Sequence, residues 1–484
     1  MMKELKFPKD FLWGGASWAS GFEGARCEDG KSLDVWDDWF AREPERFYDQ
    51  VGPNSTLNMY HRYKEFVQLL SDLNMNSFRF SISWARFIPD GKGEVNQAAV
   101  SFYQNLIDEL KKHDIEPIIC LWHFDLPLCM QEIGGWLSRK VVEYFTSYCE
   151  HVFSYFAKQV KYFVVLNEVG VLPQGGYLYD FQPPNRIDFK ESIQAGYHLL
   201  LAQAKVIACY RKHHYNGEIG TVLNPNPVYP RSDHPEDVKA AKFVDMIRER
   251  FYLDVSIKGE LPKDFLAFVK EYSLTPKMAV EDTQVLKNNT VDFLGVNYYQ
   301  PCRVQTPDSN WEDTKLKFYP ENSRQKQSDH FPKKGQLMPE KFYKIYDKPD
   351  KKMNFSRGWE IYPKGIYDTL MRLKNEYGNI KCYIGENGMG VENEEQFIDQ
   401  NGQVNDAYRI EFYDEHLYWV HKAIQEGSNC FGYHVWAPFD NWSPINAFKN
   451  RYGFYRYDTK DKSLTIKKSG LWFSNVCKDN ALKR

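Results

Sequence analysis

The sequence predicts an α/β fold, a single (β/α)8 barrel of the TIM-barrel type, with residues 1–484 as one domain and long βα loops over its C-terminal face. Short apolar, β-rich runs alternate with longer amphipathic stretches, which is typical of βαβ units around a parallel sheet. There are eight such runs, the number that closes a small barrel. The sequence shows no internal repeat, low-complexity tract or interdomain linker that would divide it.

The candidate strands follow one another along the whole chain. In order they are FLWGGAS (11–17), SFRFSISW (77–84), EPIICLWHF (116–124), KYFVVLN (161–167), EIGTVLN (218–224), VDFLGVNYY (291–299), KCYIGEN (381–387) and CFGYHVWAP (430–438).

The stretches between these runs predict the outer helices. FYQNLIDELKKHD (102–114) and EYFTSYCEHVFSYFAKQ (143–159) carry apolar residues at i, i+3 and i+4. Residues 304–353 differ, because they are rich in Lys, Asp, Gln and Pro and have few apolar pairs. A connection of this length in a compact domain is usually functional or disordered, so we expect a loop over the barrel mouth.

Charge and cysteine content narrow the functional class. The net charge is −3 with both signs interspersed, which predicts neither nucleic-acid nor membrane binding. The nine cysteines are odd in number and scattered, as expected for reduced thiols in a cytosol. The first residues lack an apolar signal core, and no apolar run is long enough to span a membrane. We therefore expect a soluble cytoplasmic protein; whether it forms a homo-oligomer is left open.

Aromatic residues make up 16% of the chain, with 13 Trp, 32 Tyr and 33 Phe. Sugar-binding clefts use flat rings against the apolar faces of pyranoses. The alternative is that these rings only fill a large core, and composition alone does not separate the two interpretations.

Polar residues gather at or near the C-terminal ends of different candidate strands. In a barrel these ends converge on one face, where active sites are built. The sequence therefore predicts one pocket that contains Arg79, His123, Asn167, Glu168, Asn297, Tyr299, Glu386 and Trp436.

Two glutamates at strand ends are candidates for catalysis. Glu168 ends the run VVLNE and Glu386 ends the run YIGEN. A buried carboxylate is costly unless it is solvated, paired or used in chemistry. A retaining glycosidase needs two carboxyl groups about 5–5.5 Å apart, one to protonate the leaving oxygen and one to attack the anomeric carbon. The alternative is that each glutamate is a structural residue satisfied by a helix N-terminus.

Three further residues could serve the same site, namely Arg79, Tyr299 and His123. Arg79 can keep a neighbouring carboxylate ionised, and Tyr299 can donate a hydrogen bond to it. A structural salt bridge is the alternative for Arg79. His123 is either a core residue or a partner of sugar hydroxyls, and no second ligand at metal-binding spacing accompanies it, so we expect no metal site.

Eight motifs in order give the chain a resemblance to glycoside hydrolase family 1, the β-glucosidase and 6-phospho-β-glucosidase family. They are FLWGGAS with EGA, RFSISWAR, WHFDLP, LNE, GVNYY, GWEIYPKGI (358–366), YIGENG, and the block from WAPFDNWS to NRYG. The matches cover essentially the whole length. Single motifs of this kind are weak, but eight in order are specific.

The resemblance implies a role for each matching residue. Glu168 matches the acid/base and Glu386 the nucleophile of a retaining double displacement, which needs no cofactor. The residues that orient the nucleophile match Arg79, Asn297 and Tyr299. The sugar-binding residues match His123, Asn167, Trp436 beneath the sugar and Trp359 at the aglycone wall.

The chain departs from the family pattern at two places near these motifs. Gly21 stands where the family has a Gln that binds two hydroxyls, so we expect this hydroxyl partner to be missing here. Val169 replaces the usual Pro after the acid/base, a change expected to alter backbone rigidity more than chemistry.

The loop DNWSPINAFKNRYG bears on substrate choice. Family members that act on neutral glucosides have a Glu and a Trp where this chain has Ser443 and Pro444. Loss of the Glu removes a charge that would repel a 6-phosphate. Phospho-glycosidases of the family resemble this arrangement, with a Ser, a Lys and a Tyr. Ser443 and Tyr452 match, whereas Lys449 stands one place early and Asn450 takes the Lys position.

We therefore expect retaining hydrolysis of β-glucosides that carry a 6-phosphate, with phosphate bound by Ser443, Lys449 and Tyr452. Lys449 reaches phosphate only if the loop adjusts; otherwise it points to solvent, as most lysines do. The first rival interpretation is a β-glucosidase that acts on unphosphorylated sugars. The second is a sugar-binding family member without catalysis, against which the two retained glutamates argue.

Overall fold

A computed structural model describes residues 4–309, 332–333 and 335–484 of the chain. Eight parallel strands close into a barrel, and each falls within one of the eight predicted runs. In barrel order they are β2 (Leu12–Ala16), β3 (Ser77–Ser81), β4 (Glu116–Cys120), β5 (Tyr162–Val164), β6 (Glu218–Leu223), β8 (Phe293–Asn297), β13 (Cys382–Asn387) and β14 (Cys430–Val435), and β14 pairs again with β2. The predicted barrel is confirmed.

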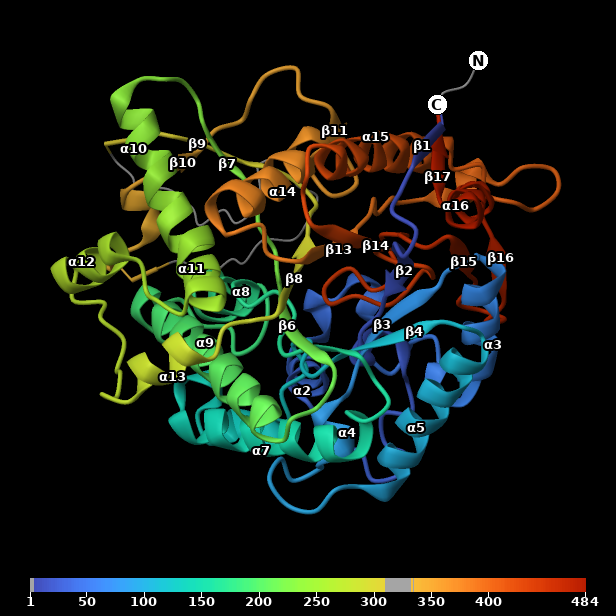
Figure 1. Cartoon of the computed structure of the whole chain (residues 1–484), viewed down its shortest axis with the longest axis horizontal. Coiled ribbons are helices and arrows are strands. Elements are labelled where there is room, and N and C mark those ends of the chain that lie inside the picture. The colour runs from blue at the N-terminus through green and yellow to red at the C-terminus, as the bar shows by residue number, and fades with distance from the viewer. Residues whose placement is uncertain (1–3, 310–331, 334) are drawn as a thin grey trace.

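Helices surround the barrel (Figure 1). The longer ones are α3 (Met59–Asp72), α5 (Gln97–Lys112), α7 (Arg139–Phe156), α9 (Phe189–Lys212), α10 (Pro235–Val244), α11 (Phe251–Lys258), α12 (Lys263–Glu271), α14 (Lys364–Glu376), α15 (Ala407–Gln425) and α16 (Lys468–Asp479). The shorter ones are α1 (Ala19–Phe22), α2 (Val35–Arg42), α4 (Trp84–Phe87), α6 (Leu128–Glu132), α8 (Val171–Tyr177), α13 (Asp282–Asn288) and the π-helical turn Asp245–Arg250.

Helix α5 shows why such stretches become outer helices. The Asn96 side chain caps its N-terminus by accepting a 3.1 Å hydrogen bond from the Ala98 amide. Phe102, Leu106 and Leu110 recur every four residues and are buried. These side chains form one apolar stripe toward the barrel, and charged residues occupy the opposite face. The predicted stretches 102–114 and 143–159 lie largely within α5 and α7.

Apolar side chains fill the inside of the barrel. A separate buried cluster contains Ile118, Cys120, Tyr162, Val164, Val222, Phe293 and Tyr383. The Tyr162 ring packs edge-on to Phe293 and flat against Phe431, with ring centroids 5.7 and 5.6 Å apart. The barrel is therefore packed as a core, and space for a ligand is left only at its mouth.

The segment 304–353 contains more structure than the predicted loop. Residues 310–331 and 334 lie outside the described residues. At the described ends of the segment, β9 (Cys302–Gln305) pairs with β10 (Lys344–Ile345) and with β7 (Val228–Pro230). A short hairpin follows, made of β11 (Met353–Asn354) and β12 (Trp359–Glu360). These strands are short, and they form with few apolar residues because backbone hydrogen bonds to the neighbouring strands hold them.

The first and last strands lie side by side (Figure 1). Strand β1 (Glu4–Lys6) pairs antiparallel with β17 (Ala481–Lys483). A further hairpin joins β15 (Tyr455–Tyr457) to β16 (Leu464–Ile466). Within the described part of the chain, no helix is both long and apolar enough to cross a lipid bilayer.

Candidate active site

A pocket of about 270 Å³ lies where the carboxyl ends of the barrel strands meet. Eight of the predicted site residues line it: His123, Glu168, Tyr299, Trp359, Glu386, Trp436, Ser443 and Tyr452. Arg79, Asn167 and Asn297 are fully buried and contact these lining residues. Lys449 is not among the lining residues. The structure thus brings together all the predicted residues except Lys449.

Glu386 lies in β13 and is held from two sides. The Arg79 guanidinium from β3 donates to its Oε1, and the Tyr299 hydroxyl donates to its Oε2 at 2.6 Å. Burial raises the pKa of Glu386, while the Arg79 charge and the Tyr299 hydrogen bond act in the opposite direction. The carboxylate is thereby fixed in one orientation, as a nucleophile requires.

Glu168 follows β5 and has different partners. Its Oε1 accepts hydrogen bonds from the side-chain amides of Asn224 and Asn297, both at 2.9 Å. Burial and the nearby charge of Glu386 raise the pKa of Glu168 to about 7. The residue has a φ of 50°, a left-handed conformation that costs a non-glycine residue about 1–2 kcal/mol. Such strained positions concentrate at functional sites.

The partners of both glutamates decide between the two interpretations of these residues. Among the described residues, the partners of the two carboxyl groups are side chains in or just after other barrel strands, not the N-terminus of a helix. The interpretation as structural caps therefore does not fit. An acid with a pKa near neutrality beside an arginine-bound carboxylate is the arrangement that general acid catalysis with a nucleophile needs.

His123 is neutral and lines the pocket. Burial, with the Arg79 charge, holds its pKa well below the usual range. The Asn167 amide lies 3.0 Å from His123 Nε2 and donates to it, which leaves the proton on Nδ1. Nδ1 is buried and lacks a hydrogen-bond partner among the described residues. His123 thus contributes a neutral ring to the wall and a buried N–H without a partner among the described residues.

Aromatic rings form two walls of the pocket. The Trp436 ring lies 5.9 Å from the His123 ring, and the Trp359 ring lies 5.3 Å from Tyr299. Trp436 follows β14 and Trp359 belongs to β12, so the two walls come from different parts of the chain. Flat rings in the same pocket as two carboxyl groups suit a sugar and its leaving group.

The space beside Gly21 is occupied by an indole ring. A Cβ on Gly21 would lie 2.0 Å from Trp18 Nε1 and 2.7 Å from the Trp442 carbonyl oxygen. Trp18 lines the pocket and stacks on Trp442, with ring centroids 5.9 Å apart and an interplanar angle of 15°. A side chain as large as glutamine therefore does not fit at position 21, because Trp18 replaces it in the wall.

The loop after β14 lines the pocket with Ser443 and Tyr452, while Lys449 points elsewhere. Lys449 Nζ lies 3.2 Å from Glu392 Oε1 and 5.4 Å from the centre of the Tyr48 ring. The loop turns sharply, because Ile445 and Ala447 both have positive φ. This turn directs Lys449 away from the pocket.

Among the lining residues that were not predicted from the sequence, three matter for the geometry of the site. Asn224 bonds Glu168, Trp18 fills the space beside Gly21, and Arg357 lies in the turn of the β11–β12 hairpin. Asn224 directly follows β6, so the rule that found the other strand-end residues applies to it too. The sequence offers no comparable signal for Trp18 or Arg357.

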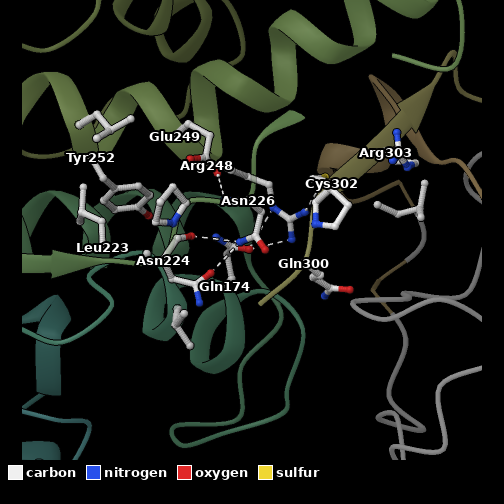
Figure 2. A pocket seen from close by; sticks show the side chains of 16 residues that line it. Gln174, Leu223, Asn224, Asn226, Arg248, Glu249, Tyr252, Gln300, Cys302 and Arg303 are labelled. Atoms are coloured by element: carbon white, nitrogen blue, oxygen red, sulfur yellow. Dashed lines mark hydrogen bonds between the residues drawn. The ribbon is translucent and has the colours of Figure 1, made fainter. Parts of the chain in front are cut away.

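A second cavity of about 100 Å³ adjoins the pocket and shares Val171, Asn224, Asn226 and Gln300 with it. Figure 2 shows the Arg248 side chain at its centre, beside Gln174. Arg248 donates to Gln174 Oε1 from Nε at 3.0 Å and from Nη2 at 2.8 Å. Burial raises the pKa of Glu249 to about 8. Polar space therefore continues behind the Asn224 side chain that bonds Glu168.

One group of described side chains could offer three ligand atoms to a metal ion. It consists of Glu150 on α7 with Cys209 and His213 at the end of α9 and just beyond it. Glu150 and His213 are exposed, and none of the three lines the pocket. The chemistry of the pocket itself requires two carboxyl groups and water.

Comparison with known proteins identifies the family. The model of glycosyl hydrolase family 1 matches residues 3–482. The chain belongs to glycosyl hydrolase family 1. The resemblance and the (β/α)8 fold inferred from the sequence are thus confirmed. As a member of this family, the protein is a glycoside hydrolase that acts on β-glycosides by the retaining mechanism.

Relatives within family 1 include enzymes that are named as phospho-glycosidases and enzymes that are named as glucosidases. The chain is 48% identical to the 6-phospho-beta-glucosidase GmuD of Bacillus subtilis (strain 168), with 98% of each chain covered. It is 33% identical to beta-glucosidase A of Acetivibrio thermocellus, over 99% of this chain and 100% of that one. Among solved structures, the family 1 β-glucosidase of Thermotoga maritima superimposes with a TM-score of 0.87 at 30% identity, with 100% of both chains covered.

Proposed function

We propose that this family 1 enzyme hydrolyses β-glucosides whose non-reducing glucose carries a 6-phosphate. The observation that supports this proposal most is that Ser443 lines the pocket. Family members that act on unphosphorylated sugars have a glutamate at this position. The only carboxylic acids among the described lining residues are Glu168 and Glu386. A dianionic substrate therefore meets no additional acidic side chain in this part of the wall. The name of the 48% identical relative supports the same substrate class.

We assign the chemistry to the two glutamates. Glu386 attacks the anomeric carbon while Glu168 protonates the leaving glycosidic oxygen, and a covalent glycosyl–enzyme ester forms. Glu168 is then a carboxylate and takes a proton from the incoming water, which attacks the anomeric carbon and releases Glu386. The bonds to Arg79 and Tyr299 position the nucleophile. The raised pKa of Glu168 suits a group that must first donate and then accept a proton.

Binding roles follow from the walls of the pocket. We assign His123 and Asn167, which bond each other, to the hydroxyls of the sugar that is cleaved. Trp436 lies beneath that sugar, and Trp359 stands on the leaving-group side near Tyr299. Ser443 and Tyr452 present hydroxyl groups for phosphate oxygens. Asn297 bonds Glu168 and also contacts Asn167, so it couples the acid to the hydroxyl-binding side.

A β-glucosidase that acts on neutral sugars is the second candidate. The observation in its favour is Lys449, which pairs with Glu392 and does not line the pocket. The relative from Acetivibrio thermocellus carries the name of this activity. The two candidates differ only in the group at C6, so one pair of substrates separates them.

The test compares p-nitrophenyl β-glucoside with its 6-phosphate for the wild type, Ser443→Glu and Glu386→Gln. We expect wild-type kcat/KM to be at least about 100-fold higher for the phosphorylated substrate, because charge-assisted hydrogen bonds contribute several kcal/mol in total. Ser443→Glu should remove this preference, and Glu386→Gln should inactivate the enzyme on both substrates. A wild-type preference for the neutral glucoside would assign the enzyme to the second candidate function.

Two further properties belong to this proposal. We infer that residues 1–484 act as one domain, since the family model spans 3–482 and β1 pairs with β17. A cytoplasmic location is consistent with the substrate, because phosphorylated sugars are retained inside cells. All nine cysteines are free in the structure, which is consistent with a reducing compartment.

A further inference from the structure

The pocket of this enzyme contains a single permanently charged cation. Among the described residues that line it, Arg357 is the only basic side chain of the lysine or arginine type. The acidic side chains among them are Glu168 and Glu386. His123 is neutral because burial and Arg79 lower its pKa. Arg79 itself is fully buried, does not line the pocket and is bonded to Glu386. A dianionic phosphate in the pocket therefore has only one lining side chain able to neutralise its charge.

Lys449 is engaged elsewhere. Its Nζ pairs with Glu392, which is only 7% exposed, and lies over the face of Tyr48. The position that carries the Lys in phospho-glycosidases is Asn450 here, and its amide contacts Asn446 Oδ1 at 3.4 Å. To reach the pocket, Lys449 would have to give up its ion pair with the buried Glu392 carboxylate, which is unfavourable.

Arg357 lines the pocket, and its hairpin is held in place by hydrogen bonds. Its hairpin is anchored to the loop after β13, because Asn354 Nδ2 donates to the Gly390 carbonyl at 3.0 Å and Ser356 Oγ accepts from the Glu392 amide at 3.1 Å. The Arg357 guanidinium lies 4.3 Å from the centre of the Trp359 ring. Only 8% of the residue is exposed. Stacking on a ring fixes the plane of the guanidinium at little entropic cost.

Arg357 also lies close to the predicted phosphate ligands. A Cβ on Gly390 would touch the Tyr452 ring at 2.5 Å, so the loop that anchors the hairpin packs directly on Tyr452. The positive charge of Arg357 opposes the burial effect that raises the pKa of Tyr452. Arg357, Ser443, Asn446 and Tyr452 all line the pocket. One cation and two hydroxyl groups thus face the same space.

We propose that Arg357, rather than Lys449, supplies the positive charge that binds the 6-phosphate, together with the hydroxyl groups of Ser443 and Tyr452. This inference rests on the proposed 6-phosphate substrate. A guanidinium can donate two parallel hydrogen bonds to phosphate oxygens, which a lysine cannot do. Phosphate recognition then comes from the β11–β12 hairpin and does not require the loop after β14 to rearrange.

The test compares Arg357→Gln and Arg357→Lys with the matched variant Lys449→Gln. Rates are measured on p-nitrophenyl β-glucoside and its 6-phosphate, and glucose 6-phosphate and glucose binding are measured by calorimetry. We expect Arg357→Gln to lower the ratio of the two kcat/KM values, phosphorylated over neutral, by about 50-fold, since a hydrogen bond to a charged group is worth about 1.5–3 kcal/mol. Its affinity for glucose 6-phosphate should fall by a similar factor. Arg357→Lys should fall between Arg357→Gln and the wild type.

Lys449→Gln should change the same ratio by less than about threefold, as expected for a cation paired outside the pocket. A large loss in Lys449→Gln with a small loss in Arg357→Gln would overturn the assignment and return phosphate binding to Lys449. Equal losses on both substrates in Arg357→Gln, with a normal circular dichroism spectrum, would also overturn it, because they indicate a role in the leaving-group wall. If the wild type itself shows no preference for phosphate, the proposed function fails, and this inference fails with it.

Discussion

At the scale of single residues, the two glutamates differ in the charge and hydrogen bonding around them. Glu386 is bound by a guanidinium and a phenol, whereas Glu168 is bound by two neutral amides. Glu168 additionally feels the charge of Glu386, which with burial raises its pKa to about 7. This difference matches the two roles that we propose for these glutamates, because only the ionised form attacks carbon and only the protonated form donates a proton.

This difference predicts the pH dependence of the enzyme. Glu168 must be protonated to act as an acid, so kcat/KM should fall as pH rises through about 7. Glu386 must be ionised, and its raised pKa should place the acidic limb above the range of an ordinary glutamate. The measurement is the pH profile for phenyl β-glucoside 6-phosphate, whose leaving group needs protonation. Since the phosphate itself titrates near pH 6, it affects the acidic limb and leaves the alkaline limb for Glu168.

Glu168→Gln is the control for the assignment of the alkaline limb. It should remove that limb and lower kcat/KM for the phenyl substrate by about 10²–10⁴-fold, the usual contribution of a general acid. The loss should be smaller for a 2,4-dinitrophenyl leaving group, which departs without a proton. An alkaline limb that survives in Glu168→Gln would show that another group controls it.

At the scale of elements, helix α1 illustrates how a neighbouring side chain compensates for the departure from the family pattern at Gly21. Trp18 precedes the helix and Gly21 lies within it, and the indole occupies the volume that a side chain at position 21 would need. We predict that Gly21→Gln is destabilised by about 1–3 kcal/mol through overpacking. Trp18→Ala should also destabilise, since it removes a buried ring. The double variant should be less destabilised than the sum of the two by about 1 kcal/mol or more.

Urea unfolding of the wild type, both single variants and the double variant measures this coupling. The Trp442 carbonyl also lies within 2.7 Å of the Cβ position, so recovery should be partial. Strictly additive effects would mean that Trp18 and position 21 do not compete for the same space. In that case the missing glutamine would need another explanation.

The elements of this protein differ in how far the sequence determines them. The eight barrel strands could be predicted because each is an apolar run ended by polar or turn residues, and the barrel then brings Glu168 and Glu386 to one face. The direction of the Lys449 side chain could not be predicted from the sequence, because it depends on positive φ angles at Ile445 and Ala447. Isoleucine and alanine rarely adopt such angles. Arg357 was missed because its hairpin has only two residues in each strand and no periodic pattern.

At the scale of the whole molecule, a buried ionic network joins distant parts of the chain next to the active site. Glu394, shortly after β13, accepts from Arg409 of α15 and from Lys467 at the start of α16. Lys467 also donates to Asp440 at 2.9 Å, and Arg409 pairs with Asp406. The network fixes the loop that follows the nucleophile, including Gly390, on which the β11–β12 hairpin is anchored. Catalytic geometry and global stability thus share one set of contacts.

Removing the Glu394 carboxylate should therefore destabilise the protein, although this side chain does not line the pocket. Burial alone would raise the pKa of Glu394, but Arg409 and Lys467 outweigh burial and lower it to about 2. Because the folded pKa lies below the unfolded value of about 4.3, this glutamate stabilises the fold above that value. The stabilisation is lost as pH falls from about 4.3 toward 2. We predict that Glu394→Gln lowers the free energy of unfolding by about 3–5 kcal/mol at pH 7, since two buried cations lose a shared partner.

The difference between wild type and Glu394→Gln should shrink at low pH, because proton uptake by Glu394 in the unfolded state begins near pH 4.3 and removes part of the stabilisation. Unfolding in urea at pH 7 and pH 3.5 measures both values, and Glu395→Gln on the same turn serves as a solvent-exposed control with an expected effect below about 0.5 kcal/mol. A Glu394→Gln effect that is small, or that does not decrease with acid, would show that Arg409 and Lys467 find other partners. The loop after Glu386 would then owe its position to packing and not to the ionic network.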